Sequence, residues 1–348
     1  MDLRDDSFWM GRRYARSLLE VTSDLSRLDD GNFWAVAISF EGEVTLARFQ
    51  SNFEADFPFS GSQWRSIEGD WVSSLNKDQY CLYVERVREA ISDGWVYQVN
   101  ACRQLKVESD RDELASLFGK LLTENPAPHA AYFSTPQLKI ASASPELFIS
   151  RNGSRVKTSP IKGTQSLSEQ GFGNKDQSEN VMIVDLMRND LGRICEPGSV
   201  DVSQLLRSED HPGLRHLVSD VVGQLRDDMS WKEIFEALLP AGSISGAPKS
   251  SALSVKWRTT SASVKWPTMA TSFDATPRRC GASSAARALR AAGSSGLYLA
   301  TFAPNGSFLP LAFMNSSALV MAAIERSSHS LLVAPQVVRP WPPRTQPL

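Results

Sequence analysis

The stretch SPELFISRNGSRVKTSPIKGT, residues 144–164, decides how we interpret this chain. Its centre predicts a β-hairpin. Asn152-Gly153 accepts the two positive φ angles of a tight type I′ turn, and apolar and polar residues alternate on both sides. A two-residue loop at 152–153 would pair Glu146 with Ser159 across the ladder. We therefore expect a stiff hairpin at the centre of the fold.

Two reactive side chains flank this hairpin. Lys162 would lie three residues past the partner of Glu146, or roughly 10 Å along the ladder. Pro160 has no N–H to donate, so we expect the chain to bend there and re-aim Lys162. The pattern predicts an acid and an amine gathered at one end of the hairpin. Spacing alone is also typical of a solvated sheet end, and this alternative stays open.

The segments SPELF and SPIKGT resemble the chorismate-utilising enzymes, in particular component I of the aminodeoxychorismate synthases. The distinguishing residue is Lys162, because anthranilate synthases and the salicylate and isochorismate enzymes typically carry Ala in PIAGT-like segments. The resemblance implies that Lys162 is the nucleophile on chorismate and that Glu146 is the general acid and base. It also implies a substrate-binding role for Thr164.

Composition describes an ordinary globular protein. The 348 residues are 42% apolar and 22% charged, enough for one large or two ordinary domains. We expect no transmembrane helix and no secretory leader, because no run of 18 apolar residues occurs and the N-terminus is charged. Four scattered cysteines, Cys81, Cys102, Cys195 and Cys280, predict reduced thiols and a cytoplasmic protein. A net charge of −2 argues against nucleic-acid binding.

The segment DQSENVMIVDLMRNDLGRIC, residues 176–195, predicts a helix with Met182 and Leu186 on its core side. Asp176 and Glu179 are spaced i, i+3, which places both carboxylates on one face. Such a pair suits Mg²⁺, although most such pairs form only a solvated face. The segment resembles the family signature ENLMIVDLxRNDLGRV, which implies that Glu179, with help from Asp176, binds Mg²⁺. The polar residues from Asp185 to Asp190 are expected to be structural.

Two further segments suggest substrate-binding residues. His216 precedes LVS in HPGLRHLVSDVVGQL; a lone histidine is more often structural, but the resemblance places it near substrate. In LLPAGSISGAPKSSAL, residues 238–253, Gly242 and Gly246 would let the backbone approach a bound anion. The spacing excludes a P-loop. The segment resembles the family's PGGSITGAPK, which implies that Ser243 lies in the substrate pocket.

The resemblance ends near Val255. Residues 251–348 hold two acids and ten bases, so residues 1–250 carry −10 and the tail +8. The family's IRT strand, Gly-rich turn and final E-x-x-E helix have no counterpart, and the Pro-rich end PQVVRPWPPRTQPL would interrupt a helix. The tail is either a divergent structure or a shifted reading frame, and its composition favours the second. We therefore predict poor catalysis.

These observations predict an α+β fold of large, mostly antiparallel sheets covered by helices, with an aberrant or incomplete C-terminal part. The expected divisions are a short N-terminal subdomain at 1–76, a chorismate-binding domain at 77–253 and the tail at 254–348. The N-terminal subdomain should include a buried strand at Phe33–Phe40, and WVYQVNACRQL, residues 95–105, should be another.

The activity implied is amination of chorismate to 4-amino-4-deoxychorismate, impaired in this chain. The ammonia would come from a separate glutamine amidotransferase subunit. Two alternatives remain: an anthranilate synthase component I, which Lys162 disfavours, and a non-catalytic relic that still contacts an amidotransferase.

Overall fold

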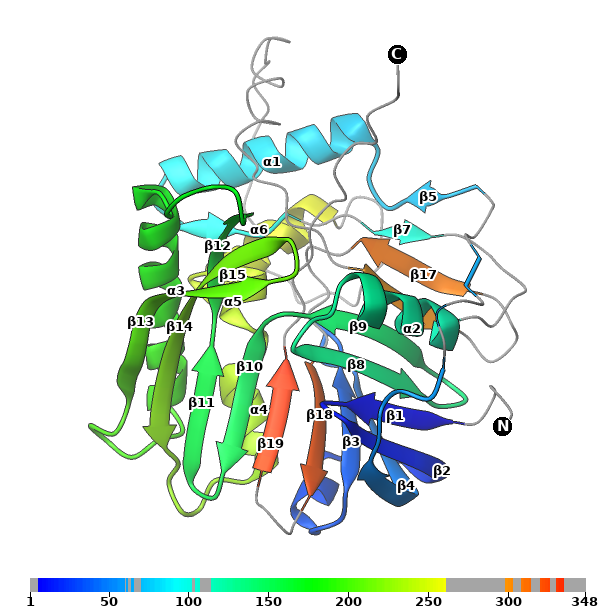
Figure 1. The fold of residues 1–348 in the computed structure, drawn as a ribbon. Coiled ribbons are helices and arrows are strands. Elements are labelled where there is room, and N and C mark those ends of the chain that lie inside the picture. Colours follow the sequence, from blue (N-terminus) through cyan, green and yellow to red (C-terminus); the bar gives the residue numbers. More distant parts are fainter. Residues whose placement is uncertain are drawn as a thin grey trace.

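The computed structural model of the chain confirms the α+β class, because antiparallel strands form one large sheet and helices cover it (Figure 1). The described residues are 6–59, 61, 64–65, 70–101, 104–106, 114–260, 298–302, 308–313, 320–325 and 330–334. For 256–260 and for the strands from 298 onward, only the course of the backbone is described.

The large sheet has fifteen strands among the described residues, in the order β12-β14-β11-β10-β19-β18-β3-β4-β2-β1-β8-β9-β16-β17, with β13 also paired to β14. Its strands are β1 (Ser7–Met10), β2 (Arg13–Thr22), β3 (Trp34–Ile38), β4 (Val44–Glu54), β8 (His129–Ser134), β9 (Lys139–Ser144), β10 (Leu147–Asn152), β11 (Arg155–Ser159), β12 (Ile161–Ser166), β13 (Asp201–His211), β14 (Leu214–Gln224), β16 (Tyr298–Phe302), β17 (Phe308–Phe313), β18 (Val320–Glu325) and β19 (Ser330–Ala334). Two small pairs lie apart from it: β5 (Val72–Ser73) with β7 (Leu105–Lys106), and β6 (Gln98–Val99) with β15 (Gly246–Ala247).

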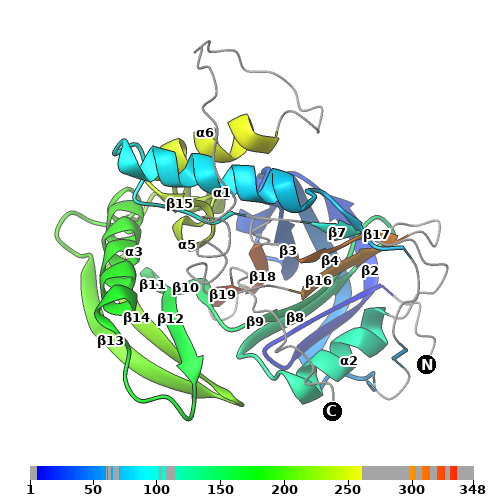
Figure 2. The same ribbon diagram turned by 90° about the horizontal axis from the view of Figure 1, so that it is seen from above.

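Helices cover the sheet from several sides. They are α1 (Lys77–Ser92), α2 (Leu114–Glu124), α3 (Asn174–Gly192), α4 (Trp231–Leu238), α5 (Gly242–Ser245) and α6 (Lys249–Thr260), with a 3₁₀ helix at Leu25–Asp29. Seen from above, α3 lies against β12–β14 on one side of the molecule and α2 lies on the other, beside β8 and β9 (Figure 2). Within the described ranges, no helix combines the length and apolar character needed to cross a membrane.

The sheet has two halves, which we call the α3 side and the α2 side after the helix beside each, and both halves bury apolar residues. On the α3 side, the buried face of the helix packs with β10, β11, β14 and α4, through residues such as Ile183, Met187 and Val221. On the α2 side, Phe118 packs over Tyr132 and Phe57, and Phe8 contacts Phe33 and Phe133. Each helix therefore buries one apolar stripe against the sheet, as amphipathic helices do.

The hairpin is confirmed, but the predicted turn was wrong by one residue. Asn152 pairs with Arg155, so the loop is Gly153-Ser154, and Leu147, not Glu146, pairs with Ser159. Gly153 has φ +62°, and Asn152 stays in the extended strand. A single glycine with positive φ at the first loop position supplies the required turn, so Asn152 can remain in the ladder.

The structure also tests the predicted strand at 33–40, the predicted helix at 176–195 and the predicted strand at 95–105. Trp34–Ile38 is a fully buried strand within the predicted range, and the predicted helix 176–195 is α3. Met182 and Leu186 only flank the core, because the buried face of α3 centres on Ile183, Val184 and Met187. The prediction of one continuous buried strand at 95–105 was wrong for the described residues of that range. Gln98–Val99 pair with β15 and Leu105 pairs with Ser73, while Trp95 and Tyr97 are 70% and 74% exposed.

The tail contributes four described strands. β18 pairs with β3, and β19 pairs with β10, so these two strands join the two sides of the sheet. A strand from the C-terminal part of the chain therefore pairs with an N-terminal strand. Most of the sequence that suggested a shifted frame, including Asp274 and the Pro-rich end, lies outside the described residues, as do Cys102 and Cys280. Cys81 and Cys195 are free thiols. The divisions at residues 76 and 253 stay predictions.

Candidate active site

Glu146 lies where the chain crosses from β9 to β10, between the two sides of the sheet. The backbone N–H of Glu146 donates a hydrogen bond to the Ser144 hydroxyl at 3.2 Å, and this bond holds the crossing in place. The side chain is 2% exposed, and burial raises the pKa of its carboxyl to about 7, although hydrogen bonds from Ser243 and Ile161 and the charge of Lys162 oppose the shift. Among the described residues, Oε2 of Glu146 has no hydrogen-bond partner.

Lys162 lies in a β-bulge. The register of β12 against β14 runs from Ile161 opposite Val218 to Thr164 opposite His216, so Lys162 and Gly163 together oppose one residue. Pro160 separates β11 from β12, as expected, but the bulge is the larger local irregularity, and bulges commonly re-aim side chains beside active sites. Burial lowers the pKa of Lys162 below the usual lysine value, while the charges of Glu146 and Glu179 act in the opposite direction.

The α5 segment forms one wall beside the lysine. Lys162 Nζ donates to the backbone oxygen of Ser243 at 3.3 Å, and Asn100 Nδ2 donates to the same oxygen at 2.7 Å. Protein atoms occupy the positions where the glycines of this segment would carry a Cβ. A Cβ at Gly242 would lie 2.3 Å from Leu186 Cδ2, and one at Gly246 would lie 2.1 Å from the backbone oxygen of Gln98. Because glycine has no Cβ, the side chain of Leu186 and the backbone of Gln98 can approach this segment closely.

Helix α3 brings the two predicted metal ligands to the bulge. Gly163 has φ +85°, and a Cβ there would lie 2.9 Å from Cβ of Asp176, so the first turn of α3 contacts the backbone beside Lys162. Glu179 is near enough to Lys162 for its charge to oppose the lowering of the lysine pKa by burial, and it also faces Lys175 at 3.6 Å. Within the described part of the chain, no three His, Cys, Asp or Glu side chains gather to hold a metal.

Asp176 and Glu179 are hard oxygen donors, the type of ligand that Mg²⁺ takes. Mg²⁺ takes hard oxygen ligands and commonly binds one or two carboxylates, completing its shell with substrate and water. Two carboxylates on one helix face, Asp176 and Glu179, supply that number, and a site with soft or nitrogen ligands has no counterpart in the described residues.

His216 and Thr164 form a pair on adjacent strands. They are cross-strand neighbours of β14 and β12, and Thr164 Oγ1 lies 2.9 Å from His216 Nδ1. His216 is buried, and its ring lies 4.9 Å from that of His211 on β13. The pair is two residues past Lys162 on the same strand, which brings it to the predicted site.

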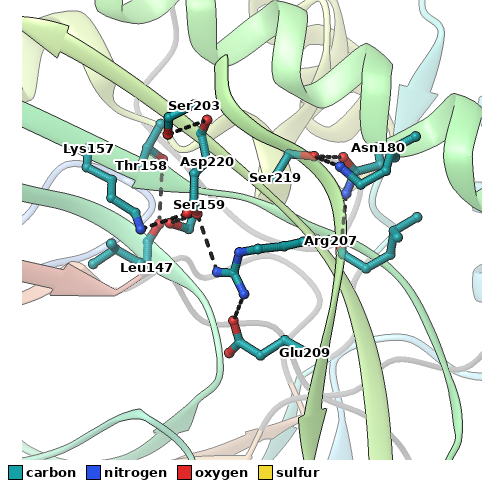
Figure 3. Close-up of polar contacts among 12 residues, drawn as sticks. Leu147, Lys157, Thr158, Ser159, Asn180, Ser203, Arg207, Glu209, Ser219 and Asp220 are labelled. Atoms are coloured by element: carbon teal, nitrogen blue, oxygen red, sulfur yellow. Dashed lines mark hydrogen bonds and ion pairs between the residues drawn. The ribbon is translucent and has the colours of Figure 1, made fainter. Parts of the chain in front are cut away.

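A second group of polar contacts surrounds the buried carboxylate of Asp220 (Figure 3). Asp220 on β14 accepts hydrogen bonds from Lys157 Nζ at 2.8 Å and Ser159 Oγ at 2.7 Å, and Arg207 on β13 approaches it to 3.4 Å. Arg207 also pairs with Glu209. These contacts hold the pKa of the Asp220 carboxyl below its usual value against the effect of burial.

The charged residues of α3 that were expected to be structural form ion pairs. Asp190 and Lys249 form a buried ion pair at 2.7 Å, and Asp185 pairs with Arg188 in solvent. Sequence reasoning missed two residues at the site, Asn100 and Asn180. Asn180 lies on the buried face of α3, where the helical period calls for an apolar side chain, and that irregularity was the available signal.

The arrangement brings together an amine and a carboxyl whose pKa values shift toward each other. Such pairs are typical of sites where one group acts as a base or nucleophile and the other as an acid. Glu146 comes from the crossing between β9 and β10, Lys162 comes from β12, and Ser243 contacts both.

Comparisons with known proteins agree with this geometry. The family model described as chorismate binding enzyme matches residues 45–255. The chain is 38% identical over 208 residues to aminodeoxychorismate synthase component 1 of Escherichia coli (strain K12), covering 57% of this chain and 46% of that protein. It is 32% identical over 252 residues to anthranilate synthase component 1 1 of Haloarcula marismortui, covering 69% and 51%. The chain thus matches about half the length of these curated relatives.

Solved structures share the fold at low sequence identity. An isochorismate synthase, DhbC, from Bacillus anthracis superposes with a TM-score of 0.59 at 18% identity, covering 97% of this chain and 91% of that one. Anthranilate synthase component I from Streptococcus pneumoniae gives a TM-score of 0.58 at 17% identity, covering 94% and 87%. At such identities the likeness concerns the fold alone.

Proposed function

Because this chain belongs to the family of chorismate binding enzymes, we propose that it aminates chorismate to 4-amino-4-deoxychorismate, as an aminodeoxychorismate synthase component I would. The observation that carries the proposal is Lys162 beside Glu146, with the pKa of the amine lowered and that of the acid raised. The resemblance of the SPIKGT segment assigns the lysine to amination, since related enzymes typically carry Ala at that position.

The proposed reaction uses both groups in sequence. The neutral amine of Lys162 adds to the ring of chorismate as the C4–O bond breaks, and Glu146 gives its proton to the departing hydroxyl, which leaves as water. Ammonia then forms the new bond at C4 as the C–N bond to Lys162 breaks. The proton lost from ammonia returns to Glu146. A carboxyl with a pKa of about 7 is suited to both transfers near neutral pH.

Substrate would be held by the neighbouring polar residues. His216, Thr164 and Ser243 are the proposed substrate-binding residues, and all three lie on the elements that flank Lys162. Asp176 and Glu179 would bind Mg²⁺, which supplies positive charge for a substrate carboxylate. The unpartnered Oε2 of Glu146 leaves one buried acceptor or donor for the substrate.

The ammonia source belongs to the proposal as well. Component I enzymes of this kind work with a partner subunit, so we infer a separate glutamine amidotransferase that supplies ammonia. We place the reaction in the cytoplasm, because the scattered cysteines favour a reducing compartment.

Turnover in this chain should be weak. The family's IRT strand and E-x-x-E helix have no counterpart in the sequence, and these normally complete the grip on the substrate and the metal. The same absence favours a second candidate function from a different class: a non-catalytic relic that binds an amidotransferase or chorismate without turnover.

The decisive experiment incubates the purified full chain with chorismate, Mg²⁺ and a high concentration of ammonium, and identifies the product by chromatography and mass spectrometry. We expect 4-amino-4-deoxychorismate, lost by at least about 10³-fold in Lys162→Ala because the nucleophile is removed. Anthranilate as the product would assign the chain to the rival activity. Binding of chorismate with no product in wild type would support the relic.

A further inference from the structure

The bulge that carries Lys162 leaves backbone groups outside the ladder, and one buried side chain takes them up. Lys162 and Gly163 together oppose Leu217, which interrupts the regular hydrogen bonds between β12 and β14. Asn180 Nδ2 donates to the backbone oxygen of Leu217 at 2.9 Å and to that of Lys162 at 3.5 Å. The two donors of one amide thus bind both sides of the bulge.

The oxygen of the same amide is fixed from a second bulge. Ser219 Oγ donates to Asn180 Oδ1 at 2.6 Å (Figure 3). The same hydroxyl accepts the backbone N–H of Leu206 at 2.9 Å. Leu206 lies in the irregular part of β13, between the partners of Asp220 and Val218, and has φ +54°. One chain of hydrogen bonds therefore joins both edges of β14 to α3.

The side-chain amide of Asn180 is buried, so it does not contribute to the polar surface of the protein. Asn180 is 1% exposed and Ser219 is fully buried, and Asn180 shares its helix face with Ile183, Val184 and Met187. Burying an amide is unfavourable unless its donors and acceptor are paired, and here each has a partner. A fully paired buried polar group adds little net stability compared with an apolar side chain, and its best-attested use is to fix register.

We propose that Asn180 is a positioning residue that holds the Lys162 bulge at a fixed place against the turn of α3 that carries Glu179. Asn180 follows Glu179 directly in the helix, so the same contact sets where the carboxylate stands relative to the amine. The link to turnover rests on the proposed function, whereas the link to the geometry of the bulge does not.

The test compares Asn180→Leu with Asn189→Leu in the full chain. Asn189 is an exposed residue of the same helix, so the control makes the same chemical change without touching the bulge. Hydrogen exchange followed by mass spectrometry should show residues 160–166 exchanging at least about tenfold faster in Asn180→Leu, with the α2 side of the sheet unchanged. The kcat for chorismate should fall at least about tenfold while KM stays within about twofold.

A milder variant covers the case in which Asn180→Leu does not fold. Ser219→Ala leaves the amide in place but frees its oxygen, so we expect the same local exchange change at smaller size. Unchanged exchange at 160–166, or exchange raised equally over the whole chain, would overturn the proposal in either variant. If wild type makes no product, the proposed function fails, yet the exchange comparison still decides the role of Asn180.

Discussion

The α2 side of the sheet and the α3 side are stabilised by different kinds of contact. On the α2 side, aromatic rings pack against one another, with Phe8, Phe33 and Phe133 forming one group. The α3 side buries an apolar core too, but it also carries buried polar groups, Asp220, Glu146 and Asn180, that depend on specific partners. Apolar packing is non-directional, whereas a buried polar group is stable only in one arrangement.

This difference explains why the reactive groups lie on the α3 side. Fixing an amine and a carboxyl at a defined geometry needs directional contacts, and two bulges, one glycine and one asparagine supply them around β12 and β14. The α2 side buries its aromatic and apolar residues without such constraints. The four predictions below separate these contributions.

The largest effect on stability should come from the aromatic side. Phe8 is fully buried against Phe33 and Phe133, so Phe8→Ala removes a whole ring and leaves a cavity. We expect the free energy of unfolding to fall by about 3–5 kcal/mol in urea titrations. The KM of the folded fraction for chorismate should not change, and a selective loss of substrate affinity would contradict the division between the two sides.

The next largest effect on stability depends on pH, and it is a gain in stability where Phe8→Ala gives a loss. The pKa of Glu146 is raised from 4.5 to about 7, so between these values the folded protein binds a proton that the unfolded chain lacks, and stability falls as pH rises. Glu146→Gln removes this loss. The variant should match wild type at pH 4.5 and exceed it by up to about 3 kcal/mol above pH 7, measured by denaturant titration across the range. A constant difference at all pH values would show that the carboxyl is not the cause.

Two glycines with positive φ provide a matched comparison of packing. Gly163 at +85° has Asp176 within 2.9 Å of a Cβ position, whereas Gly153 at +62° has open space around it. Gly153→Ala should cost about 1 kcal/mol from backbone strain alone. Gly163→Ala should cost about 2–3 kcal/mol and also lower turnover, because α3 must move away from the bulge. If thermal unfolding showed that both variants lose the same stability, the contact between Gly163 and α3 would make no contribution to stability.

The smallest effect concerns a partly exposed ion pair. Lys157 is 38% exposed in its pair with Asp220, and Asp220 keeps Ser159 and Arg207 as partners. Lys157→Met should therefore lower stability by about 1 kcal/mol, less at high salt. Lys120→Met, which removes the exposed helical pair with Glu124, is the control and should change stability by less than about 0.5 kcal/mol. A larger loss in the control would contradict the ranking by burial.

Local patterns predicted much of the fold. The alternation around Gly153 gave the hairpin, the helical period and the acidic start gave α3, and short apolar runs gave strands such as β3. The turn position was wrong by one residue because neighbouring Asn and Gly can each end a strand. The segment at 95–105 was wrong because apolar residues alone do not reveal whether a neighbouring element exists to cover Trp95 and Tyr97.

The sequence by itself determined the chemical groups of the candidate site and, through the resemblance of its motifs, their proposed roles. The motifs that contain Lys162, Glu146 and Glu179 are local, so their resemblance to the family could be seen without a structure, whereas spacing alone left a solvated alternative open. Only the tertiary structure decided that Lys162 stands in a bulge, that Ser243 contacts both it and Glu146, and that Asn180 joins two bulges to α3. These contacts join segments distant in sequence, and their geometry depends on strand register, which no local pattern specifies.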